Sequence, residues 1–223
     1  MGQAIGQSLP FAVGIAASPP PIIVVVLILV TARGRTNGPA YLLGWMFGLA
    51  AVGTIVLVLA PDGTNDGGGP PTWANVLKLA LGLALLAMAV NQFRGRRPDD
   101  EPETPKWMGA IDDFSALKSL GAGIALSAGN PKNLLFAIGA EATIAETGIS
   151  THEEAIAFAI FLVIASLGVG VPVAMSVVLG DRAAAILERL KAWLIRNNAL
   201  IMGVLMLLIG ATLLGDAIAG FSS

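Results

Sequence analysis

Two proline-containing runs interrupt long apolar stretches of this chain. The first is Ser18, Pro19, Pro20 and Pro21, and the second is the run from Asn130 to Asn133. Proline removes a backbone donor and clashes with the preceding turn, so each stretch is predicted to form two half-helices. In lipid, the freed backbone groups need protein partners or a polar cavity. Paired broken helices in the two halves of a chain indicate a transport site.

Lys132 puts a charge at the second break. Asn130 suits the cap of the following helix and Pro131 its first position, where the helix carries a positive partial charge. A lysine at the bilayer centre costs roughly 2.5–3.5 kcal/mol on insertion scales. Glu141 cannot neutralise it along one helix, because the two lie ~13 Å apart. The charge must be met by an anionic substrate group, by a carboxylate from elsewhere, or by loss of its proton.

The predicted substrate-binding residues therefore lie at the two breaks: Ser18, Pro19, Pro20, Ser127, Asn130, Pro131, Lys132 and Asn133. Lys132 is also a candidate for coupling transport to protons. Glu141 fits either a coupling role with it or a solvated position at the membrane interface. The structural alternative is a pair of simple proline kinks with a lysine that snorkels or forms an ion pair. Lys78, near the end of another apolar stretch, is expected to snorkel.

Composition identifies the chain as integral to a membrane, because 55% of the residues are hydrophobic and 13% are charged, and the long apolar runs predict the fold class as all-α. The chain has no cysteine and no motif for catalysis, metal binding or a phosphate-binding loop, so we expect no enzyme, no metal, no cofactor and no nucleic-acid partner. Six spans are predicted, of which the first and fourth are broken: Leu9–Val30, Ala40–Ala60, Trp73–Val90, Leu120–Ala145, Ala155–Leu179 and Ala199–Leu214.

Loop charges predict the orientation of these spans. Lysine and arginine gather in the first, third and fifth connections, whereas the second and fourth carry acidic residues but no lysine or arginine between their spans. The positive-inside rule then puts both termini outside. The chain divides into a first three-helix repeat (1–93), a charged cytoplasmic linker (94–112) and a second three-helix repeat (113–223). An odd number of spans in each half makes the repeat inverted.

Local patterns add detail to this arrangement. Residues 14–18 match residues 123–127 at four of five positions, just ahead of each break. Gly44 and Gly48 form a small-xxx-small pattern, which favours close helix packing within the monomer. Residues 107–118 and 182–196 have amphipathic spacing and fit either interfacial helices or extensions of the neighbouring spans. Gly168, Gly170 and Pro172 predict a kink in the fifth span.

The Asn130-Pro131-Lys132 run, the Ser18–Pro21 cluster and the three-plus-three layout resemble the LysE-like exporter superfamily. The Ser-Pro-Pro-Pro start, the size and the Ala/Gly-rich spans are most similar to its GAP family of glycopeptidolipid- and sulfolipid-addressing proteins. This resemblance implies an exporter in a bacterial plasma membrane with both breaks on the substrate path. The missing cysteines depart from the thiol-relay branch, and the absence of acids at the breaks departs from the metal-ion branches.

The leading hypothesis is export or flipping of a lipid or small amphiphile with a polar or anionic head, coupled to protons through Lys132. The alternatives are an amino-acid exporter and a non-transporting scaffold for the synthesis of envelope lipids. Expected partners are membrane lipids and a small-molecule or glycolipid substrate. Homo-oligomerisation, the substrate and the coupling ion stay open.

Overall fold

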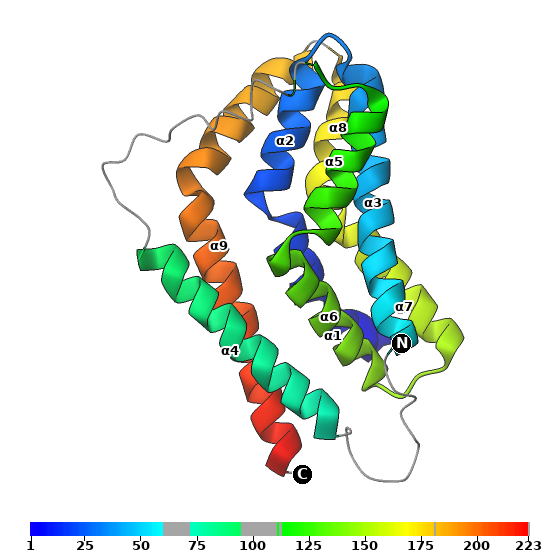
Figure 1. Ribbon diagram of the computed structural model, residues 1–223, viewed down its shortest axis with the longest axis vertical. Coiled ribbons are helices and arrows are strands. Elements are labelled where there is room, and N and C mark those ends of the chain that lie inside the picture. The colour runs from blue at the N-terminus through cyan, green and yellow to red at the C-terminus, as the bar shows by residue number, and fades with distance from the viewer. Residues whose placement is uncertain (60–71, 95–110, 112, 181, 223) are drawn as a thin grey trace.

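The structure is a computed structural model, and it describes residues 1–59, 72–94, 111, 113–180 and 182–222. The described residues are helical almost throughout (Figure 1). The helices, in chain order, are α1 (Gly2–Ala16), α2 (Pro19–Val30), α3 (Gly34–Leu59), α4 (Thr72–Arg94), α5 (Ala116–Ala128), α6 (Pro131–Ala145), α7 (Thr151–Ala165), α8 (Leu167–Leu179) and α9 (Arg182–Ser222).

Both predicted proline breaks are confirmed. α1 and α2 meet at an angle of 52°, and Ser18 is extended, with φ −69° and ψ 111°, directly before the prolines that begin α2. Between α5 and α6 the chain passes through Asn130, whose side-chain Oδ1 accepts from the backbone N–H of Lys132 at 3.0 Å. Proline at the first helical position and asparagine at the cap therefore set the start of α6.

The kink predicted in the fifth span is also present. α7 and α8 are bent by 58° relative to each other. The bend falls at Ser166, just before Gly168 and Gly170, while Pro172 lies inside α8. Gly168 approaches the end of α1 so closely that a Cβ there would overlap the backbone oxygen of Ala16. The bends of two spans therefore lie in direct contact.

Length and composition make α3, α4 and α9 candidate membrane spans, and the bent pairs α1–α2 and α7–α8 raise the number to five within the described residues. The six predicted spans are not all recovered in this way, because α5 is an apolar helix of only 13 residues and the α5–α6 region carries Lys118, Lys132 and Glu141. A sixth span made of α5 and α6 stays a prediction.

α9 is much longer than the predicted span Ala199–Leu214, since it runs without a break for 41 residues. Its first part includes the amphipathic segment 182–196, which continues into the apolar part of the helix. Leu187 and Leu194 from this segment are buried against Ile23 and Val26 of α2. Of the two interpretations of the segment, extension of the neighbouring span fits this continuity.

Glycines let α3 and α5 lie side by side, as predicted for the small-xxx-small pattern. A Cβ on Gly44 would overlap the backbone oxygen of Leu120, and one on Gly48 would overlap Ser127 Oγ. Across the same contact, a Cβ on Gly123 would overlap Tyr41 O. These close approaches bring the second half of the chain against the first along α5, up to Ser127 next to the α5–α6 break.

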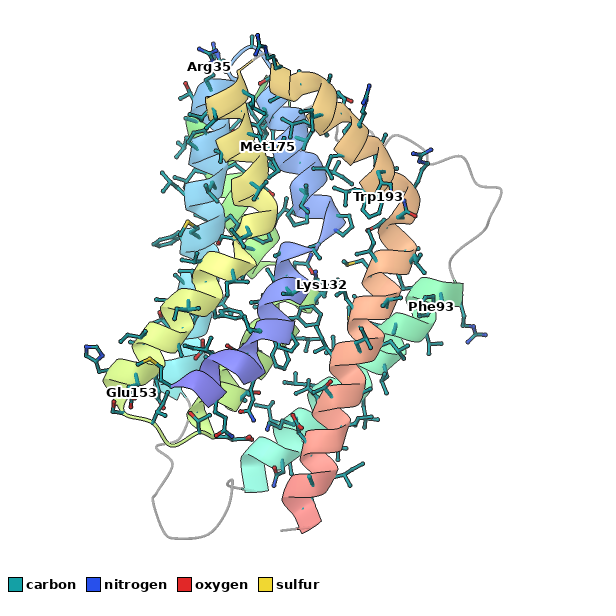
Figure 2. The ribbon with its side chains drawn as sticks, turned by 180° about the vertical axis from the view of Figure 1, so that it is seen from behind. Arg35, Phe93, Lys132, Glu153, Met175 and Trp193 are labelled. Carbon is teal, nitrogen blue, oxygen red and sulfur yellow. The ribbon has the colours of Figure 1, made fainter. Side chains whose placement is uncertain are left out.

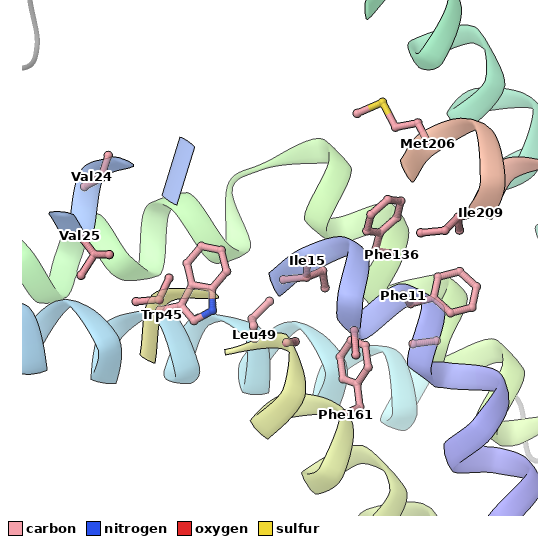
Figure 3. Packing of buried hydrophobic residues seen from close by; sticks show 14 of the residues in the cluster. Phe11, Ile15, Val24, Val25, Trp45, Leu49, Phe136, Phe161, Met206 and Ile209 are labelled. Carbon is pink, nitrogen blue, oxygen red and sulfur yellow. The ribbon is translucent and has the colours of Figure 1, made fainter. Parts of the chain in front are cut away.

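The core lies around α1, which packs against α6 and α7. Phe11 of α1 and Phe136 of α6 meet edge to face, with ring centroids 6.4 Å apart (Figure 3). α4 packs along α9, beside this core. The charged linker predicted at 94–112 falls largely outside the described residues, as does the start of the amphipathic segment 107–118, whose last residues begin α5.

Candidate functional site

The ammonium group of Lys132 joins the two broken helices. Its Nζ donates to Ser18 Oγ at 2.7 Å and to the backbone oxygen of Gly14 at 3.2 Å. Lys132 is buried, with 4% of its surface exposed, and Ser18 is 1% exposed. In Figure 2 Lys132 lies beside the α1–α2 break. The break provides the acceptors, because the oxygen of Gly14 lies in the last turn of α1, where a continuing helix would have used it.

Side chains on α6 hold the lysine in place. The Lys132 Nζ lies 5.3 Å from the ring centroid of Phe136, one turn along the same helix, which is a cation–π distance. The ring of Phe136 also packs against Gly14, where a Cβ would come within 2.8 Å of Ile209 and still closer to Phe136. Gly14 therefore gives the lysine and the ring access to the end of α1.

Asparagines connect α5 to α6 across the second break. Asn130 caps α6, as described above, and Asn133 Nδ2 donates to the backbone oxygen of Leu126 at 3.0 Å. That oxygen lies in the last turn of α5, where the helix leaves it without an intrahelical donor. Two of the predicted site residues thus provide hydrogen-bond partners for backbone groups at the break, and Asn130 with Pro131 sets where α6 begins.

The remaining predicted residues are placed as follows. Ser127 is buried and donates to Ile124 O at 3.1 Å, facing Gly48 rather than the ammonium. Pro19 is buried and Pro20 is partly exposed at the start of α2. The structure also brings in a residue that sequence analysis did not single out, because Tyr41 OH donates to the backbone oxygen of Pro21 at 3.3 Å. An aromatic hydroxyl inside an apolar span was the available signal.

Glu141 does not occupy the solvated position that was one of its two interpretations. It is 2% exposed, and within the described residues neither carboxylate oxygen has a hydrogen-bond partner. It lies on α6 with Lys132 but makes no contact with the ammonium in the described part of the chain. A polar group buried in this way has lost its water without gaining a hydrogen bond.

Lys78 does not snorkel, contrary to expectation. It is 5% exposed and forms an ion pair with Glu146, the residue that caps the end of α6. The pair connects α4 of the first half to α6 of the second. The expectation failed because the partner lies 68 residues away in the chain and is brought near only by helix packing.

The chemistry available at the centre is recognition of an anion. The described residues provide Lys132 with two neutral oxygens and no carboxylate. Trp45 Nε1 on α3 and Asn133 Oδ1 on α6 are also buried, and neither has a hydrogen-bond partner within the described residues. A buried ammonium without a counter-ion is costly, and an anionic group would offset that cost.

Comparison with known proteins gives one family. A family model described as "Sap, sulfolipid-1-addressing protein" matches residues 9–219, which includes both breaks and all the predicted site residues. Comparisons with curated proteins and with solved structures give no significant match.

Proposed function

The chain belongs to the sulfolipid-1-addressing protein (Sap) family, and from that premise we propose that it exports or flips a lipid or small amphiphile with an anionic head. The observation that carries the proposal is the buried ammonium of Lys132, held between two broken helices by Ser18 and Gly14. The family's printed description favours a lipid over an amino acid as cargo. The same description fits transport rather than catalysis.

In this proposal the anionic head displaces a neutral partner of Lys132. Ser18 Oγ and Gly14 O are acceptors for the ammonium while cargo is absent. A sulfate, phosphate or carboxylate offers a charge-assisted hydrogen bond, which is roughly twice as strong as one to a neutral acceptor. The exchange gives selectivity for anionic heads and leaves the ammonium satisfied between transport cycles.

We propose an inverted repeat in the plasma membrane, with six spans. Exchange of the two halves would map α1 onto α5, α2 onto α6, α3 onto α7–α8 and α4 onto α9. The contact of α3 with α5 then corresponds to that of α7 with α1, and the contact of α2 with α9 to that of α6 with α4. This correspondence supports alternating access by movement of one repeat against the other.

The proposed orientation has both termini outside the cell. Both ends of the chain lie toward the same end of the molecule in Figure 1. Arg35 lies at the opposite end from Glu153 (Figure 2). This separation of charge supports the orientation given by the positive-inside rule.

Lys132 and Glu141 are proposed to couple transport to protons. Intramembrane ionisable residues commonly form proton relays. Glu141 is suited to hold a proton because it is buried without a partner in the described residues. Charged side chains on α4 and α7 do not give Glu141 a cationic partner. Lys78 on α4 pairs with Glu146, and Glu154 on α7 is another acid.

The test is a comparison of envelope lipids and secreted metabolites in cells that make the wild-type protein, no protein, or Lys132→Met. Accumulation of an anionic lipid inside, together with its loss from the outer envelope, is expected in the last two. A change confined to secreted amino acids would favour the amino-acid exporter. A normal envelope with Lys132→Met, but not without the protein, would favour the scaffold. The matched control is Lys118→Met, which removes an exposed lysine from α5.

A further inference from the structure

A groove of about 390 Å³ lies on the outside of the helices where the two bent spans meet. Its walls are the end of α1, the start of α2 and the α7–α8 bend, with Leu190 of α9 at its edge. All of the lining residues are apolar or glycine. Val13, Leu167 and Val171 leave about half of their surface exposed along it.

The groove adjoins the lysine site through the chain itself. Ala17 lines the groove, and the next residue, Ser18, accepts the hydrogen bond from Lys132. Likewise Val13 lines the groove, and Gly14 is the second acceptor of the ammonium. The last turn of α1 therefore has the apolar groove on one side and the buried charge on the adjoining side.

We infer that this groove holds one acyl chain of the anionic lipid that the protein transports. The inference rests on the proposed function, and it deepens it by assigning the apolar part of the cargo to a second site. The occupant must be apolar along its whole length, because no side chain of the lining offers a hydrogen bond or a charge. It must also end in an anionic group, because Lys132, on the adjoining side of the last turn of α1, is a cation without a carboxylate in the described residues.

The bends explain why the groove lies at this depth. α1 packs against α7 and α2 against α8, so the two spans run side by side, and the groove lies on their outer side at the level where they bend by 52° and 58°. A change in the α1–α2 bend changes the groove and the acceptors of Lys132 together, since Ala17 and Ser18 belong to the same break. The acyl chain and the head group would therefore be released in one movement.

Two tryptophan substitutions fill the groove from opposite walls: Val171→Trp on α8 and Val13→Trp on α1. Both positions are about half exposed, so the larger ring does not need to enter the core. The matched control is Val178→Trp, seven residues along α8 on the same face, exposed and outside the groove. Each protein is placed in nanodiscs of phosphatidylcholine with a small share of phosphatidylglycerol carrying the same chains, and native mass spectrometry counts the lipids that stay bound.

Wild type and Val178→Trp are expected to retain phosphatidylglycerol, and the two groove variants to retain about tenfold less. If both groove variants keep as much bound lipid as the wild type, the groove is not the acyl site, whatever Lys132 does. Lys132→Met tests the head group separately. It should abolish the preference for phosphatidylglycerol over phosphatidylcholine, and an unchanged preference would contradict the proposed function while leaving the groove assignment intact.

Discussion

Lys132 Nζ donates to Ser18 Oγ at 2.7 Å across 114 residues of chain. The contact joins the break of the first half to the break of the second, so the two interruptions form one centre. The centre is asymmetric, although residues 14–18 and 123–127 are similar in sequence. Gly14 and Ser18 accept from the ammonium, whereas their counterparts Gly123 and Ser127 lie against α3. One half provides the acceptors and the other provides the charge.

Gly123→Ala is expected to destabilise the protein, because the added Cβ would overlap the backbone of α3 at Tyr41 and Trp45. Overpacking of this kind costs roughly 1–3 kcal/mol. Gly121→Ala, two residues away on the same helix, meets nothing within 4 Å and should be neutral or slightly stabilising. Thermal unfolding in detergent compares the two. Equal melting temperatures would show that α3 and α5 are not in close contact.

The Lys78–Glu146 ion pair should appear as an energetic coupling between α4 and α6. Lys78→Met leaves the Glu146 carboxylate without its partner in a largely buried position, and loss of one member of a buried pair costs about 3–5 kcal/mol. Adding Glu146→Gln should recover most of that loss. A double-mutant cycle on unfolding free energies measures the coupling, and additive effects would mean that the pair does not form.

Some of these relationships could be predicted from the sequence and others could not. Proline and asparagine act on their own backbone, so both breaks and the cap of α6 were evident from local residue types. The partners of Lys132 and Lys78 were not, because they lie 114 and 68 residues away. The sequence could not decide between the two interpretations of Glu141 for the same reason, since helix packing rather than position along α6 determines its burial.

Glu141→Gln should leave stability nearly unchanged, because the carboxyl it replaces has no hydrogen-bond partner in the described residues. Transport should continue down a substrate gradient but no longer respond to an imposed proton gradient. Lipid movement in proteoliposomes with and without a pH step measures this. A response equal to that of the wild type would exclude Glu141 from coupling.

Orientation can be measured with single cysteines, since the chain has none of its own. Arg33 and His152 are both exposed, in connections predicted to lie on opposite sides. An impermeant maleimide should label a cysteine at position 152 in intact cells and one at position 33 only after permeabilisation. The reverse pattern would invert the proposed topology, and labelling of both positions in intact cells would contradict it.

The most direct test of the Lys132 centre is the rate at which fluorescent phosphatidylglycerol crosses the bilayer of proteoliposomes. Lys132→Met is expected to slow this movement by about 30-fold or more, because loss of one partner in a buried charge interaction costs roughly 2–5 kcal/mol. Lys118→Met, which removes an exposed lysine, should retain the wild-type rate. A Lys132→Met protein that moves the anionic lipid as fast as the wild type would contradict the assignment of the buried ammonium as the head-group site.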